Sequence, residues 1–176
     1  MESTTLVLCW GNPGRRDDGL GPALGEALAQ RDLPRVVVDS DYQLQVEAAA
    51  EVARHRRVVF VDAARRGTEP FWTRRLAAGG EAPGFSTHSV SPEALLTLAR
   101  DLFGAEPEAW ILGIRGYEFD DFSEGLSDGA RRNLGAALEY LESALGGDGL
   151  REIGAGQPPD TTQSDREGEP CQTISP

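Results

Sequence analysis

Two adjacent carboxylates, Asp17 and Asp18, stand in the glycine-rich stretch CWGNPGRRDDGLGP, residues 9–22. This stretch follows a short apolar segment and precedes a segment of helical composition, so it reads as a turn between a strand and a helix. Such turns often bind phosphate at the helix N-terminus, but two carboxylates would repel an anion there. Either aspartate could simply cap the helix and complement its dipole. The alternative is a carboxylate that faces a cation.

Two further polar residues are expected at strand ends or helix starts. Asp62 closes the apolar run VVFVD, and His88 lies in STHSVSP, three residues before the predicted N-cap Ser91. Taken alone, Asp62 could be an ordinary loop carboxylate in an Asx-turn, and a single loop histidine is more often structural. His55, which follows a predicted helix, is interpreted as such a structural histidine at the helix end.

A functional site is indicated by three residues taken together, Asp18, Asp62 and His88. All three fall on connections at one edge of the predicted sheet, the edge where parallel α/β sheets place their chemistry. Two carboxylates and one imidazole suit a divalent metal such as nickel or zinc, with coordination positions left open. The ligands are spread through the sequence, so their spacing alone is a weak signal.

The elements that must position these residues alternate between strand and helix. Runs such as Val58–Val61 are continuously apolar and β-branched, which is typical of buried parallel strands. The predicted strands are Thr5–Cys9, Arg35–Val38, Arg57–Val61, Phe71–Leu76 and Ala109–Leu112. The predicted helices are Leu20–Gln30, Leu44–Arg54, Pro92–Phe103 and Asp128–Leu145. This order predicts an α/β fold, a doubly wound three-layer sandwich with a mostly parallel five-stranded sheet. The fourth strand, 71–76, follows its neighbour without a helix and is predicted to be an antiparallel edge strand.

Composition restricts the function. The chain of 176 residues has a formal net charge of −12 and contains no lysine, which excludes a P-loop lysine and a Schiff base. An acidic chain is not expected to bind nucleic acid or anionic membranes. Two distant cysteines, no signal-peptide pattern and no membrane-length apolar run favour a cytoplasmic protein, which we expect to be a monomer.

The last thirty residues differ from the rest. From 146 to 176 there are six glycines and four prolines, and Leu150, Ile153 and Ile174 are the only large aliphatic residues. The sequence therefore predicts an α/β domain over 1–146 and a disordered acidic tail over 147–176.

Two familiar glycine-rich patterns do not fit the opening turn. Its glycines, at 11, 14, 19 and 21, do not follow the GxGxxG dinucleotide fingerprint. The four residues GNPG also occur in peptidyl-tRNA hydrolases, but the histidine that this family uses nearby is missing here, and the acidic chain does not suit tRNA.

The chain resembles the maturation endopeptidases of nickel–iron hydrogenases. That family begins with a strand and GxGN, followed by D-D/E-G-x-G, and this sequence has CWGN at 9–12 and DDGLG at 17–21. The family next has an apolar strand that ends in Asp-Ala, which is matched at 58–63. A histidine before a leucine-rich helix is matched at 87–92. Gly-Ile and a later Gly-Leu-Ser are matched at 113–114 and 125–127. These blocks occur in the family order from residue 5 to about 145. Cys9 departs from the pattern, since glycine is usual there, so no positive φ is expected at that position.

The resemblance implies an endopeptidase of α/β fold that removes the C-terminal extension of a hydrogenase large-subunit precursor. It also implies that Asp18, Asp62 and His88 form the catalytic and metal-binding trio, while Asp17 is not a ligand. The nickel is expected to be supplied by the precursor; zinc or another divalent metal on the protease is the alternative. Catalysis could be of the aspartic type or metal-assisted. A nickel-checking chaperone that binds the precursor without cutting it would use the same three residues.

Overall fold

The fold was analysed in a computed structural model, which describes residues 4–79 and 90–154. Five strands form one sheet in the order β2-β1-β3-β5-β4, in which β4 is antiparallel to β5 and the other neighbours are parallel. The strands are β1 (Thr5–Trp10), β2 (Val36–Asp41), β3 (Arg57–Ala64), β4 (Phe71–Leu76) and β5 (Glu108–Arg115). The predicted mostly parallel sheet with an antiparallel edge strand is confirmed.

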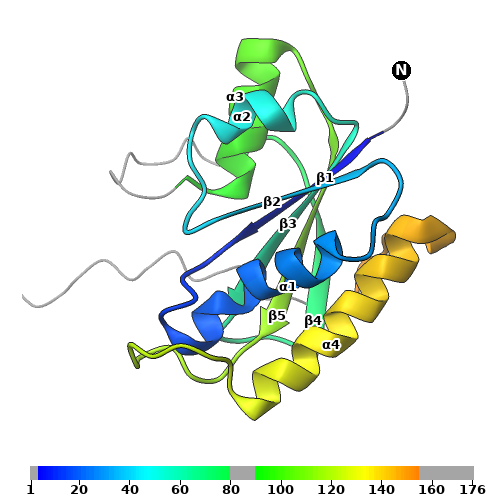
Figure 1. Ribbon diagram of the computed structural model, residues 1–176. Coiled ribbons are helices and arrows are strands. Elements are labelled where there is room, and N and C mark those ends of the chain that lie inside the picture. Colours follow the sequence, from blue (N-terminus) through cyan, green and yellow to red (C-terminus); the bar gives the residue numbers. More distant parts are fainter. Residues whose placement is uncertain (1–3, 80–89, 155–176) are drawn as a thin grey trace, which may run out of the picture.

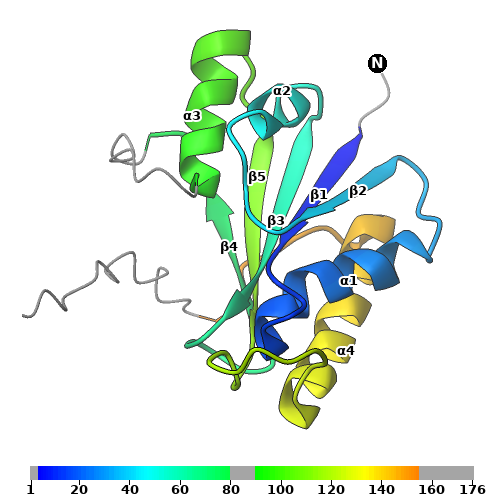
Figure 2. The same cartoon turned by 60° about the vertical axis from the view of Figure 1, so that its left-hand side comes forward.

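Helices cover both faces of this sheet (Figures 1 and 2). The helices are α1 (Leu20–Ala29), α2 (Ala48–Val52), α3 (Pro92–Phe103) and α4 (Asp128–Ser143); short helical turns occupy η1 (Arg16–Gly19) and η2 (Ala144–Asp148). Helices α1 and α4 pack together on one face, and α2 and α3 on the other. The structure is therefore the doubly wound three-layer sandwich that the sequence predicts.

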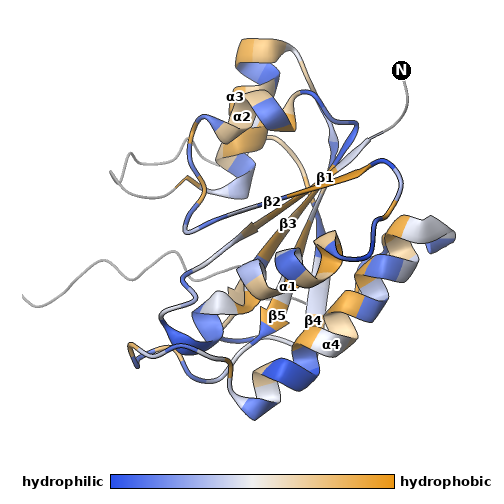
Figure 3. Ribbon diagram, in the orientation of Figure 1, coloured by the Kyte–Doolittle hydropathy of each residue, from blue (hydrophilic) through white to orange (hydrophobic). Residues whose placement is uncertain are grey.

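The core divides between the two faces because side chains alternate along each strand. Leu6, Val58 and Phe60 point toward α2 and α3, whereas Val7 and Val59 point toward α1 and α4. All five are fully buried. The hydropathy colouring shows apolar strands in the middle and mixed helices outside (Figure 3). In the part of the chain that the structure describes, no helix is both long and apolar enough to span a membrane.

Some element boundaries differ from the prediction. Helix α3 begins and ends at the predicted residues, because Ser91 caps it by accepting a hydrogen bond from the amide of Ala94 at 3.2 Å and Gly104 ends it with φ 65°. Helix α2 covers only 48–52 instead of 44–54. Before the helix the amides of Ala48 and Ala49 donate to the carbonyls of Gln45 and Val46, both at 3.1 Å, so tighter turns replace the α-helix there.

The structure also describes residues 147–154, which follow the boundary that the sequence predicts after residue 146. Ile153 forms an antiparallel bridge with Thr73 of β4, through hydrogen bonds of 2.9 and 3.2 Å. Leu150 and Ile153 pack on the α1/α4 side of the core. This segment covers the outer edge of β4, which would otherwise present unpaired backbone groups. The remainder of the expected tail, 155–176, lies outside the described residues.

Candidate functional site

The turn that carries the two aspartates lies directly on the end of β1. Gly11 has φ 142°, and a Cβ there would lie 2.0 Å from the carbonyl oxygen of Asp18. A Cβ at Gly21 would lie 2.2 Å from the carbonyl oxygen of Trp10. Both contacts are closer than any side chain permits, so these glycines let η1 and the start of α1 approach the strand. Cys9 is not among the residues with positive φ, as expected.

Asn12 organises the turn and holds Asp18. Its amide donates to Oδ2 of Asp18 at 3.0 Å, and its own Oδ1 accepts from the amide of Gly14 at 2.9 Å. Its carbonyl accepts from the amide of Arg15 at 3.0 Å. Among the described residues, no donor contacts Oδ1 of Asp18. One carboxylate oxygen is therefore fixed by the turn, while the other remains available.

Asp62 lies in β3 opposite Gly113 of β5, at the carboxyl end of the parallel strands. It lies two residues from Phe60 and two from Ala64 in the strand, so its side chain shares their face of the sheet, the α2/α3 side. Its Oδ1 accepts a hydrogen bond from the amide of Ala63 at 2.7 Å. Within the described ranges 4–79 and 90–154, its Oδ2 has no donor.

The environment of Asp62 disfavours its ionised form. Burial raises the pKa of this carboxyl to about 7, from an ordinary 3.8. The hydrogen bond from Ala63 opposes this rise, and the nearby negative charge of Asp18 adds to it. The charge of Asp18 therefore acts on Asp62, whereas a site shared by the two carboxylates stays a prediction.

The third predicted member, His88, lies within 80–89, outside the described residues. Its place beside the aspartates therefore stays a prediction. In the ranges that the structure describes, no group of three histidine, cysteine or acidic residues could hold a metal ion. Asp18 and Asp62 each have one carboxylate oxygen without a donor in those ranges, and a cation bound between them would relieve their mutual repulsion.

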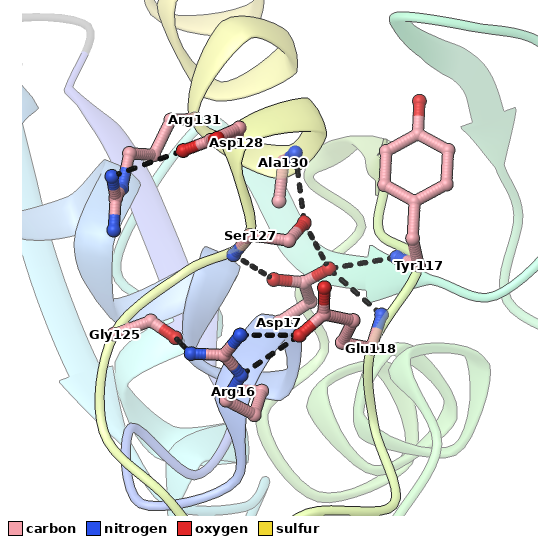
Figure 4. Close-up of polar contacts among 9 residues, drawn as sticks. All are labelled: Arg16, Asp17, Tyr117, Glu118, Gly125, Ser127, Asp128, Ala130 and Arg131. Carbon is pink, nitrogen blue, oxygen red and sulfur yellow. Dashed lines mark hydrogen bonds and ion pairs between the residues drawn. The ribbon is translucent and has the colours of Figure 1, made fainter.

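Asp17 has a role that sequence reasoning missed. Its side chain is fully buried and accepts four hydrogen bonds (Figure 4). The amides of Tyr117 and Glu118 donate to Oδ2 at 2.7 and 2.9 Å, the amide of Ser127 donates to Oδ1 at 2.7 Å, and the Ser127 hydroxyl donates to Oδ2 at 2.8 Å. Burial alone would raise the pKa of Asp17, but these hydrogen bonds outweigh it and the pKa is lowered. Asp17 therefore binds the loop before α4. The sequence feature that could have indicated this role is the Gly-Leu-Ser block at 125–127, because its Ser127 donates to Asp17.

A cavity of about 520 Å³ lies elsewhere, at the amino ends of the parallel strands. Its lining includes His55, Arg56, Arg57 and Arg75. His55 is buried, and its Nδ1 donates to the carbonyl of Glu51 at 2.9 Å, which agrees with the predicted structural role at the end of α2. The paired carboxylates, not this cavity, define the candidate site.

No family model matches the sequence, and a search of the curated proteins finds no match. Comparison with solved structures does find similar proteins. The hydrogenase maturating endopeptidase HybD from E. coli aligns with a TM-score of 0.62 at 23% identity, over 86% of this chain and 98% of that one. An endopeptidase from Escherichia coli, solved in solution, aligns with a TM-score of 0.62 at 26% identity, over 86% and 97% of the two chains.

A third similar structure comes from an archaeon. It is the NiFe hydrogenase maturation protease HycI from Thermococcus kodakarensis KOD1, with a TM-score of 0.62 at 19% identity, covering 81% of this chain and 92% of that one. These alignments span nearly the whole of each relative, so the similarity is not confined to a common α/β substructure. The resemblance noted in the motifs is thus confirmed at the level of the fold: the chain has the fold of the nickel–iron hydrogenase maturation endopeptidases.

Proposed function

We propose that this protein is an endopeptidase of hydrogenase maturation. It would remove the C-terminal extension of a nickel–iron hydrogenase large-subunit precursor after nickel has been inserted. The observation that carries the proposal is the pairing of Asp18 and Asp62 at the carboxyl end of the sheet, in a fold shared with maturation endopeptidases. The precursor is then the partner, and the protein works as a cytoplasmic monomer.

In this proposal the nickel belongs to the precursor and is part of the substrate. The ligands are Asp18 and Asp62, with His88 as the third. Two oxygen donors and one imidazole make an incomplete shell, which suits a metal that a partner presents with ligands of its own. A resident zinc or other divalent ion on the protease is the alternative, and it would use the same atoms.

Asp62 is suited to handle the proton in peptide hydrolysis. A general base works best when its pKa lies near the operating pH, and burial brings the pKa of Asp62 to about 7. Asp18 is anchored by the amide of Asn12 and keeps its other carboxylate oxygen free of donors among the described residues, so it is suited to orient and to bind a cation. We therefore assign proton transfer to Asp62 and positioning of the metal to Asp18. When bound, the metal would polarise the scissile carbonyl or hold it in place.

The experiment is incubation of the purified protein with nickel-loaded precursor, followed by intact-mass measurement. An endopeptidase produces a precursor that has lost its C-terminal extension, together with the released peptide. A chaperone forms a complex with the precursor on size-exclusion chromatography, and the mass of the precursor chain stays unchanged. Binding without any loss of mass would therefore refute the proposed hydrolysis and support the chaperone.

A further inference from the structure

Residues 16 and 17 are fastened to the loop between β5 and α4, which covers residues 116–127. The amide of Arg16 donates to the carbonyl of Ser123 and the amide of Asp17 donates to the carbonyl of Glu118, both at 2.9 Å. The Arg16 side chain also pairs with the Glu118 carboxylate and reaches the carbonyl of Gly125 (Figure 4). With the four bonds to the Asp17 carboxylate, hydrogen bonds run in both directions between the turn and the loop.

The hydrogen bonds to the buried Asp17 carboxylate are of a strong kind. The Asp17 carboxylate accepts four hydrogen bonds of 2.7–2.9 Å, and hydrogen bonds to a carboxylate are shorter and stronger than those between neutral groups. Three of its donors are backbone amides, whose dipoles replace the water that the charge has lost. Of the side chains, these three contacts order only that of Asp17, and they join the loop to the turn.

Asp18 follows directly in the same short helical turn. Adjacent residues of such a turn point in different directions, so the full burial of Asp17 directs Asp18 away from the loop and toward β1. On that side the Asn12 amide holds Oδ2 of Asp18. Two contacts thus determine the position of the Asp18 carboxylate. The Asn12 amide holds the carboxylate itself, and Asp17 fixes the backbone to which Asp18 is attached.

We propose that Asp17 is a positioning residue for Asp18, acting through the hydrogen bonds that join the turn to the 116–127 loop. It touches neither substrate nor metal. The inference rests on the proposed function only where Asp18 is called catalytic. That Asp17 determines the position of Asp18 does not depend on the proposed function.

The Asn12 amide reports this coupling without any cleavage assay. Its acceptor is the Asp18 carboxylate, so its hydrogen-exchange rate measures how well Asp18 keeps its position. In Asp17→Asn, an NH2 group replaces one of the two accepting oxygens. That group would face donors of the loop without accepting from them, and the remaining oxygen is neutral and accepts more weakly. We expect exchange at Asn12 to become about tenfold faster in Asp17→Asn, measured by NMR well below the melting temperature.

Asn133→Ala is the matched control for loosening of the loop alone. The buried Asn133 side chain donates to the carbonyl of Arg115 at 2.8 Å and to the hydroxyl of Tyr117 at 2.9 Å, but not to the turn. Its loss should leave the Asn12 exchange rate within about twofold of the wild-type rate. Equal acceleration in both variants would show that Asn12 responds to general loosening, and would overturn the inference.

A milder pair of variants applies if Asp17→Asn does not fold. Ser127→Ala removes one donor to Asp17 and the N-cap of α4, whose Oγ accepts from the amide of Ala130 at 3.2 Å. Ser91→Ala removes the equivalent cap of α3, also at 3.2 Å, far from Asp17 in the chain. Ser127→Ala should accelerate exchange at Asn12 about threefold and Ser91→Ala should not. No difference between them would contradict the inference.

Kinetics add a second readout. If wild-type protein cleaves the precursor, Asp17→Asn should lower kcat about tenfold with little change in KM, because the substrate still binds while Asp18 is misplaced. An unchanged kcat in a folded variant would refute a positioning role. A wild-type protein that cleaves nothing would refute the proposed function, while the exchange rates would still decide the role of Asp17.

Discussion

Asp62→Asn should stabilise the protein, and more strongly at alkaline than at acidic pH. The wild-type carboxyl has a pKa of about 7 in the folded state and an ordinary value of 3.8. The folded state therefore holds its proton up to a higher pH than the unfolded state, and the penalty for ionising the buried group grows as pH rises from about 4 to about 7. Asparagine keeps the oxygen that accepts from Ala63 but never ionises.

The size of the effect follows from the two pKa values. Each pKa unit corresponds to about 1.4 kcal/mol, so the full penalty above pH 7 is about 4 kcal/mol. At pH 5 the folded group is protonated and the penalty is only about 2 kcal/mol, so the variant should gain about 2–3 kcal/mol more at pH 8 than at pH 5. For a domain of this size that is a difference of about 5–10 °C in melting temperature.

The assay is thermal unfolding of wild type and Asp62→Asn at pH 5 and pH 8, with a chelator present so that no metal contributes. Asp120→Asn is the matched control, because its side chain is 92% exposed and belongs to the loop at the same edge of the sheet. Comparison of two pH values removes any constant effect of the substitution. An equal stability difference at both pH values would refute the assignment of a buried, proton-retaining carboxyl at Asp62.

Three further predictions concern the rest of the domain. Truncation after Gly146 should lower the melting temperature by about 5 °C or more, because it removes the segment on the edge of β4, whereas truncation after Gly154 should not. Gly113→Ala should cost about 1–3 kcal/mol in urea unfolding, since the new Cβ would lie 2.3 Å from the Trp72 indole. Burial raises the pKa of Cys9 to about 12, so a thiol reagent at pH 8 should label Cys9 only after denaturation; rapid labelling of Cys9 in the native protein, distinguished from Cys171 by peptide mass, would contradict its burial.

The sequence was most informative where local chemistry decides the structure. The bounds of α3 follow from Ser91, Pro92 and Gly104, whose capping roles depend on neighbouring residues alone. The strand Phe71–Leu76 was predicted with its bounds and orientation, since no helix separates it from β3. Asp62 could be placed at the sheet edge because a parallel strand brings its last residues there.

What the sequence did not reveal depends on long-range contacts. The partners of Asp17 lie about a hundred residues away, so nothing beside it in the chain distinguishes a buried anchor from a helix cap. The docking of 147–154 is similar: a glycine-rich composition predicts disorder, but Leu150 and Ile153 reach the core and Thr73 supplies a backbone partner. Only the open edge of β4, which requires knowledge of the strand order, explains that segment.

The central claim is that the paired carboxylates cleave a precursor that presents nickel. Its most direct test is cleavage of nickel-loaded and nickel-free precursor by wild type, Asp18→Asn and the exposed-loop control Asp120→Asn, measured by intact mass. We predict that wild type and Asp120→Asn release the C-terminal extension from nickel-loaded precursor alone, and that Asp18→Asn releases it at least about a hundredfold more slowly. Cleavage of nickel-free precursor at an undiminished rate, or full activity of Asp18→Asn, would contradict the account.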